Sequence, residues 1–153
     1  YTGGANSVYL IGKHQTIYGS NSFNNLIKRN NTSASLTFSA GSTQTISGVL
    51  ELNGTQGELL VLKSSTPGNV WNINHTGSLK RLSYLNISDS TSVSTLDAKS
   101  NSTNGGNNTN WVFNSVNALV WTGAINNNFS NAGLPTHPKP SEAKVIPSWQ
   151  ADK

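Results

Sequence analysis

Apolar residues recur two positions apart in several short stretches of the chain. The pattern is clear in Leu36-Thr37-Phe38, Leu60-Val61-Leu62 and Trp71-Asn72-Ile73, and also in Val49-Leu50-Glu51-Leu52. Because successive side chains of a β-strand point to opposite faces, this spacing places the apolar side chains on one face. The pattern therefore predicts short strands that bury one side.

Similar groups follow one another along most of the chain, separated by turn signals such as Asn53-Gly54 and Thr66-Pro67-Gly68. Between Asp89 and Asp97 we expect a Ser/Thr-rich loop, and over residues 101–110 a wide Asn/Gly corner before a closing strand with Trp111 and Phe113. The predicted strands are Val8–Ile11, Thr16–Tyr18, Phe23–Lys28, Ser35–Ser39, Thr43–Leu52, Glu58–Lys63, Asn69–Asn74, Leu79–Ser88 and Asn110–Phe113.

Composition supports an all-β fold. The chain of 153 residues contains 22 Asn, 22 Ser, 15 Thr and 14 Gly, which are poor helix formers, and only 10% of its residues are charged. Two architectures fit strands that recur every ten to fourteen residues. One is a β-sandwich joined by hairpins, and the other is a parallel β-solenoid in which successive coils cover one another.

A family resemblance favours the second architecture. The residues that carry it are SFNNLIK (22–28), LTFSAGSTQTISGVLELNGTQGELLVLKSSTPGNVWNI (36–73), LSYLNISDS (82–90) and the closing STNGGNNTNWVF. From about His14 to Phe113 the chain resembles the right-handed parallel β-helix segments of large secreted bacterial surface proteins and filamentous-haemagglutinin-like adhesins. The resemblance implies a right-handed parallel β-helix (β-solenoid) with an extended C-terminal tail, and no set of catalytic residues comes with it.

Three regions are expected along the chain. Residues 1–120 form the β-solenoid module, because the opening YTGGAN has an echo in WTGAIN at residues 121–126. Residues 121–133 are then the start of a second module or a linker strand. Residues 134–153 hold four of the five prolines and are expected to be an extended tail, in which Val145, Ile146 and Trp149 could contact a neighbouring subunit.

Little in the sequence points to catalysis, a metal or a cofactor. The six acidic residues include Glu51, expected to face solvent, and Asp89 and Asp97, which are read as turn residues rather than an acid–base pair. The pairs Lys28-Arg29 and Lys80-Arg81 are expected to be solvated strand ends. The net charge is +4, but the sequence has no dense basic stripe of the kind that indicates nucleic-acid binding.

Candidate contact positions are sequons and exposed aromatic residues. Tyr9, Tyr18 and Trp149 are the aromatic candidates, whereas Trp71, Tyr84, Trp111 and Trp121 are expected to pack in the core. If the source organism glycosylates asparagine, the N-x-S/T sites in predicted loops could carry sugar. These candidate N-glycosylation sites are Asn30, Asn31, Asn53, Asn74, Asn86, Asn101, Asn107 and Asn128.

Together these features predict a non-enzymatic extracellular or cell-surface structural module. We expect a subunit of a fibre or filament that associates with itself end to end or through its C-terminal tail. The alternative is a glycan- or receptor-binding module of an adhesin or viral appendage. No apolar run is long enough to span a membrane.

Overall fold

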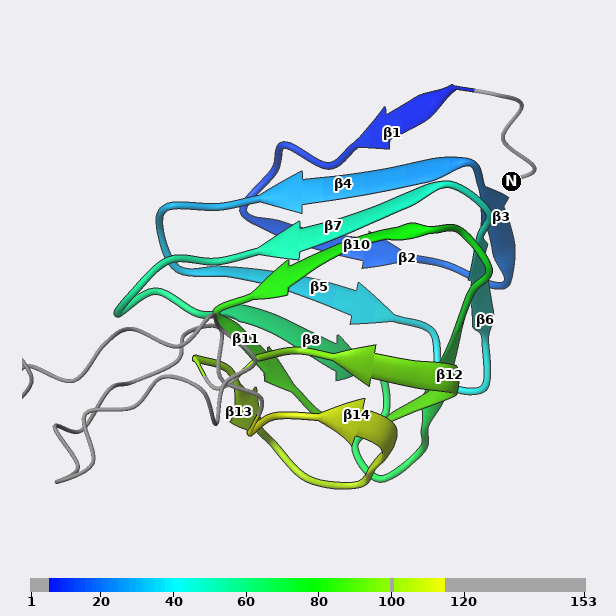
Figure 1. Cartoon of the computed structure of the whole chain (residues 1–153). Coiled ribbons are helices and arrows are strands. Elements are labelled where there is room, and N and C mark those ends of the chain that lie inside the picture. Colours follow the sequence, from blue (N-terminus) through cyan, green and yellow to red (C-terminus); the bar gives the residue numbers. More distant parts are fainter. Residues whose placement is uncertain (1–5, 100, 115–153) are drawn as a thin grey trace, which may run out of the picture. The chain divides into compact units, whose positions relative to one another are not determined.

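The computed structural model describes residues 6–99 and 101–114, and in this part the chain forms strands and turns without a helix (Figure 1). The strands in chain order are β1 (Ser7–Tyr9), β2 (His14–Ile17), β3 (Asn21–Phe23), β4 (Asn25–Arg29), β5 (Ala34–Phe38), β6 (Thr43–Ile46), β7 (Val49–Asn53), β8 (Leu60–Ser64), β9 (Trp71–His75), β10 (Leu79–Ser83), β11 (Leu85–Ile87), β12 (Ser90–Asp97), β13 (Thr103–Asn104) and β14 (Asn108–Val112).

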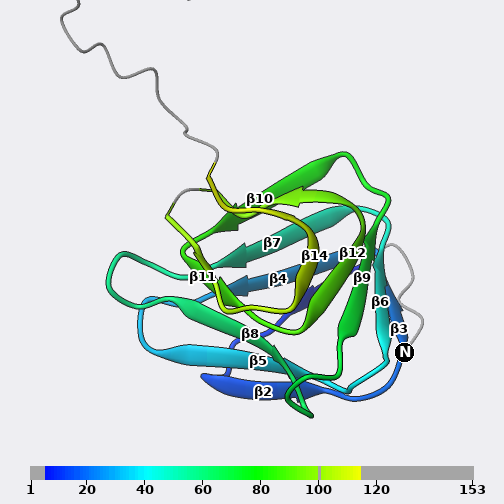
Figure 2. The ribbon, with the colours of Figure 1, turned by 90° about the horizontal axis from the view of Figure 1, so that it is seen from below.

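These strands build three parallel sheets. Sheet 1 has the order β1-β4-β7-β10, sheet 2 has β13-β11-β8-β5-β2, and sheet 3 has β14-β12-β9-β6-β3. Up to β12 the chain visits the three sheets in rotation, and each strand lies beside the strand of the circuit before it. Figure 2 shows the sheets as three sides around a common interior. The predicted all-β class is confirmed, and hairpin pairs of the kind that build a β-sandwich are not found among the described sheets.

The core consists of inward side chains that stack from one circuit to the next. Leu36 lies in register with Leu62, and Leu62 with Ile87, and all three are fully buried. Between sheets 2 and 3, the ring of Phe38 stacks on that of Trp71, with 3.8 Å between centroids. Period-two alternation thus identified the buried face correctly.

Strand boundaries differ from the prediction at the corners. The segments 23–28, 43–52 and 79–88 each contain two strands, divided at Asn24, at Ser47-Gly48 and at Tyr84, which has a positive φ of 54°. Asn and Gly are ordinary corner residues, but Tyr84 looks like a strand residue in the sequence. The chain therefore turns inside runs whose hydrophobicity is continuous.

Two strands lie where loops were expected. The predicted loop between Asp89 and Asp97 is wrong, because these residues form most of β12, which pairs with β9 and β14. The predicted corner over 101–110 contains β13 and the start of β14. Ser90 and Ser92 point into the core in place of apolar residues, so the usual hydrophobic signal is missing.

At the two ends of the stack, apolar side chains are half-buried. Val8, Leu10 and Ile17 pack against the core from the first circuit, and Trp111 and Phe113 from the last, as predicted for the closing strand. The expected boundary at residue 120, the segment 121–133 and the tail 134–153 lie outside the described residues.

Candidate functional site

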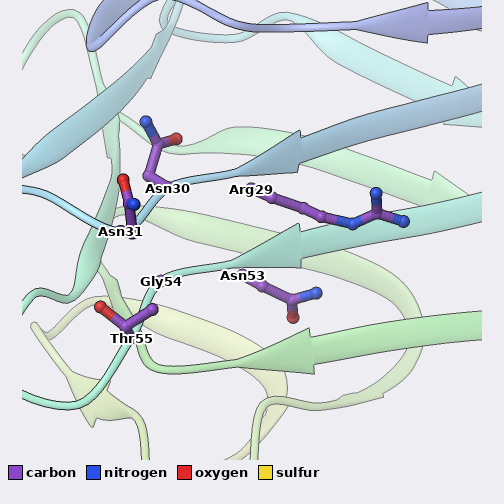
Figure 3. A pocket seen from close by; sticks show the side chains of 6 residues that line it. All are labelled: Arg29, Asn30, Asn31, Asn53, Gly54 and Thr55. Carbon is purple, nitrogen blue, oxygen red and sulfur yellow. The ribbon is translucent and has the colours of Figure 1, made fainter.

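A shallow hollow of about 470 Å³ lies at the corner where β4 and β7 leave sheet 1 (Figure 3). Arg29 and Asn53 end the two strands, and their side chains extend along the sheet, away from the loop residues (Figure 3). Five of the six residues that line the hollow have side chains that can form hydrogen bonds. The lining residues are Arg29, Asn30, Asn31, Asn53, Gly54 and Thr55.

Glycine permits the tight loop that borders this hollow. A Cβ atom on Gly54 would come within 2.6 Å of the carbonyl oxygen of Glu58, so no larger residue fits without a backbone shift. Thr55 and Glu58 exchange backbone hydrogen bonds of 3.0 Å, and Gly57 between them has a φ of +83°. The backbone of this loop is therefore fixed by two glycines.

Asn30 contributes an unsatisfied polar atom. Its side-chain Oδ1 is buried and has no hydrogen-bond partner in the described part of the chain. Its backbone N–H donates to the carbonyl of Asn53 at 2.9 Å, which joins the two circuits. A buried acceptor without a donor is unfavourable, so a water or ligand donor would stabilise it.

Beside the hollow, Glu51 lies on the outer face of sheet 1 between two arginines. Its carboxylate accepts hydrogen bonds from Arg29 Nε and, at 2.8 Å, from Arg29 Nη2, and it lies 3.4 Å from Arg81 Nη1. Asn53 Nδ2 also donates to it at 3.1 Å. The hydrogen bond from Arg29 is the largest cause that holds the pKa of Glu51 below its usual value.

The structure corrects two expectations about charge. Glu51 points away from Leu50 and Leu52 as predicted, but it does not face solvent, because it is only 4% exposed. Lys28 is not a solvated strand end either: it is fully buried, and its Nζ donates to the Gly12 carbonyl and, at 2.8 Å, to Gln15 Oε1. Burial lowers the pKa of Lys28. Arg29, Lys80 and Arg81 are exposed, as predicted.

The acidic residues of β12 are not brought together. Asp89 precedes the strand and accepts hydrogen bonds from Gly68 N and Asn107 Nδ2. Asp97 ends the strand and pairs with Lys99 at 2.6 Å. No group of three His, Asp or Glu side chains that could hold a metal occurs within residues 6–99 and 101–114.

The sequons fall in three kinds of place. Asn31 is exposed in the loop after β4, next to half-buried Asn30. Asn53, Asn74 and Asn86 lie within strands; Asn74 and Asn86 belong to predicted strands, whereas Asn53 was expected at a turn.

The remaining sequons lie at corners or outside the described residues. The side chain of Asn101 accepts a hydrogen bond from the backbone N–H of Tyr84, and that of Asn107 donates to Asp89 and Gly68. Asn128 lies outside the described residues. Asn31 is thus an exposed sequon in a loop. Its side-chain amide makes no hydrogen bond to a described residue.

A second feature is the apolar surface of the first circuit. Ile11, Tyr18 and Tyr9 are 91%, 80% and 61% exposed, whereas Trp71 is fully buried. A hollow of about 400 Å³ lies here, lined by Val8, Thr16, Ile17, Tyr18, Asn21 and Phe23. The sequence pointed to both tyrosines but not to Ile11, which continues an apolar run and looks like a core residue.

The predicted subunit contacts of the C-terminal segment, Val145, Ile146 and Trp149, lie outside the described residues.

Comparison with known proteins adds no assignment: no family model, no curated protein and no solved structure matches this chain. Among the described residues there is no helix with the length and apolar character needed to cross a membrane.

Proposed function

We propose that the chain is a right-handed parallel β-helix (β-solenoid) that serves as a non-enzymatic extracellular structural module, the subunit of a surface fibre. Three parallel sheets that the chain visits in rotation support the solenoid assignment. Crossover connections between parallel strands are right-handed in nearly all proteins, which supports the hand. The low charge and the abundance of Asn, Ser and Thr support an extracellular location.

The observation that carries the fibre role is that each of the three sheets ends in open edge strands. β1, β2 and β3 form one set of edges, and β10, β13 and β14 form the other; no described strand pairs with their outer sides. Unpaired N–H and C=O groups at a sheet edge are templates for further strands. The edges of one copy can therefore continue the sheets of the next.

Exposed apolar residues strengthen this proposal for the first circuit. Ile11, Tyr9 and Tyr18 lie on or beside β1 and β2, and Tyr18 also lines the 400 Å³ hollow. Covering such side chains on association contributes about 25 cal/mol per Å² of apolar surface. The C-terminal segment with Val145, Ile146 and Trp149 is a second route of association in this proposal.

A charge at the first circuit tests end-to-end association. We expect Ile11→Lys with Tyr18→Lys to shift the protein toward monomers in sedimentation velocity and to shorten filaments in electron micrographs, because a partner would bury two ammonium groups. The control is Val93→Lys, which charges another exposed apolar residue (65% exposed) on β12. A wild-type protein that stays monomeric at high concentration would contradict the fibre role.

The corner hollow favours a second candidate function, a glycan- or receptor-binding module. Five of the six residues that line it have side chains that can form hydrogen bonds, which suits a ligand rich in hydroxyl groups. On a glycan array, Asn31→Ala with Thr55→Ala should weaken binding, and Thr37→Ala on sheet 2 should not. An array on which the wild type binds nothing would count against this candidate.

A further inference from the structure

The net positive charge of the described residues is concentrated in the strands of sheet 1. With histidine counted as neutral, the charged residues of these strands are Lys28, Arg29, Lys80, Arg81 and Glu51. In the rest of the described chain, basic and acidic residues are equal in number. They are Lys13, Lys63 and Lys99 on one side and Glu58, Asp89 and Asp97 on the other. The whole excess of positive charge therefore belongs to one of the three sheets.

On the outer face of sheet 1 the positive groups are exposed and the negative group is covered. The side chains of Arg29 and Arg81 are more than half exposed, whereas that of Glu51 between them is buried. Lys28 is buried on the inner side of the same sheet and forms no ion pair with a described residue. An anion that approaches this face therefore meets two guanidinium groups before it meets the carboxylate.

Most N–H groups of the two arginines are not used within the described part of the chain. Each guanidinium has five of them. Arg29 donates through Nε to one oxygen of Glu51 and through Nη2 to the other, so it neutralises this carboxylate by itself. Arg81 reaches the same carboxylate through Nη1 at 3.4 Å. The charge of Arg81 is thus in excess, and its remaining N–H groups can bind an external anion.

Uncharged polar groups and an exposed aromatic ring lie next to the arginines. Arg29 also lines the corner hollow, whose other lining residues are neutral. Tyr9 is exposed and lies beside Ile27, and Ile27 lies beside Glu51 in the next strand of the sheet. Sugar hydroxyl groups can form hydrogen bonds in such a hollow, and the apolar face of a sugar ring can stack on a tyrosine. The face therefore suits a ligand that has both acidic groups and sugar rings.

The small number of cations argues against a nucleic acid. A protein surface that binds nucleic acid has a dense basic stripe and pairs with many phosphates. Sheet 1 exposes Arg29, Lys80 and Arg81, and Arg29 is already paired with Glu51. A polysaccharide with acidic groups on some of its sugars needs fewer cations, because its hydroxyl groups supply further contacts.

We propose that the outer face of sheet 1 binds an anionic polysaccharide. Its carboxylate or sulfate groups pair with Arg81 and Arg29, and its hydroxyl groups bind in the corner hollow. The inference rests on the second candidate function, the glycan-binding module, and names the class of glycan. Glu51 opposes the binding, because its negative charge lies beneath the two arginines.

The test uses the full chain, produced without N-glycosylation because Asn31 and Asn53 of the hollow are sequons. Biolayer interferometry measures the binding of alginate, which has carboxylates, of dextran sulfate and of uncharged dextran. Wild type should bind at least one anionic polymer more tightly than dextran, and the comparison of alginate with dextran sulfate identifies the acidic group. Added salt should weaken this binding, because the arginines are exposed to solvent.

Two variants with opposite effects connect the binding to sheet 1. Arg81→Gln should weaken the binding of the anionic polymer by about threefold or more, and Glu51→Gln should strengthen it by a similar factor. The matched control is Lys63→Gln, which removes an exposed positive charge from sheet 2 and should behave as wild type. Circular dichroism checks that all three variants keep the strand content.

Four results would overturn the proposal. Equal binding of all three polymers would reject the preference for acidic groups but leave the glycan-binding candidate standing. Absence of binding to these polymers and to a glycan array would reject both. Equal weakening by Arg81→Gln and Lys63→Gln would show that net charge, and not the face of sheet 1, attracts the polymer. Tighter binding of single-stranded DNA than of either anionic polysaccharide would assign the face to a nucleic acid.

Discussion

At the scale of single residues, Glu51 shows how one carboxylate joins three circuits of the chain. It belongs to β7 and binds Arg29 of β4 and Arg81 of β10. Its side chain is 6% exposed, whereas those of Arg29 and Arg81 are 59% and 56% exposed. The carboxylate is therefore desolvated beneath guanidinium groups that remain largely hydrated, so its loss costs more than that of an exposed ion pair.

The pH dependence of stability should report this network. Because the folded-state pKa of Glu51 is lowered, chiefly by the hydrogen bond from Arg29, its contribution is fully present above the unfolded value of about 4.3 and is lost as the pH falls through the folded-state pKa. We expect Glu51→Gln to lower the free energy of unfolding by about 1–3 kcal/mol at pH 7 and to flatten its fall in acid.

Urea denaturation between pH 7 and pH 3 measures this effect. Exposed Glu58 provides the control, because Glu58→Gln removes an acid of the same type from a loop. If both variants follow the wild-type curve, Glu51 does not stabilise the fold through its arginines.

At the scale of elements, the corners decide where strands end. Gly77 lies between β9 and β10, directly against Gly48 at the corresponding corner of the previous circuit. A Cβ atom on Gly77 would overlap the carbonyl group of Gly48. These two corners are close-packed backbone, which explains why glycine is found there.

Gly77→Ala should therefore destabilise the fold by about 1–3 kcal/mol, the usual cost of overpacking a close contact. The midpoint of urea denaturation should fall, with an unchanged slope. Ser78→Ala, at the exposed neighbouring position, should leave the midpoint near wild type. A Gly77→Ala variant as stable as Ser78→Ala would show that the two corners are not in contact.

Sequence patterns predicted the elements wherever apolar residues filled the inward positions. β5, β8 and β9 were found because Leu36, Leu62 and Ile73 follow a period of two. β12 was missed because Ser90 and Ser92 replace apolar residues at the inward positions. The corner hollow was not predicted, because it joins residues 29–31 with residues 53–55, and only the register between β4 and β7 brings them together.

The burial of Lys28 and Glu51 was missed for a related reason. Lys28 points inward in register with Leu52, and Glu51 is covered by side chains of the neighbouring circuits. Adjacent charged residues normally indicate a solvated surface. Their burial depends on which residues stack above and below, and that information is not present in any one strand.

At the scale of the whole described unit, the parallel register is the central feature. It stacks Leu36 on Leu62 in the core, it aligns Thr45 with Asn74 on sheet 3, and it leaves the edges that the fibre proposal uses. A shift of one residue in any pairing would exchange inward and outward side chains. The packing of the core, the outward face of each sheet and the proposed association through the sheet edges therefore depend on the same alignment.

Engineered cysteines test this register most directly, since the chain has no cysteine of its own. Thr37 and Lys63 are partners in the parallel pair of β5 and β8, on the outward face of sheet 2. Neighbouring strands lie about 4.8 Å apart, which is within disulfide range. Thr37→Cys with Lys63→Cys should oxidise to an intramolecular disulfide in the folded monomer, detected by mass spectrometry. Thr37→Cys with Val61→Cys, two residues out of register, should remain reduced; a reduced first pair or equal oxidation of both pairs would contradict the parallel stack.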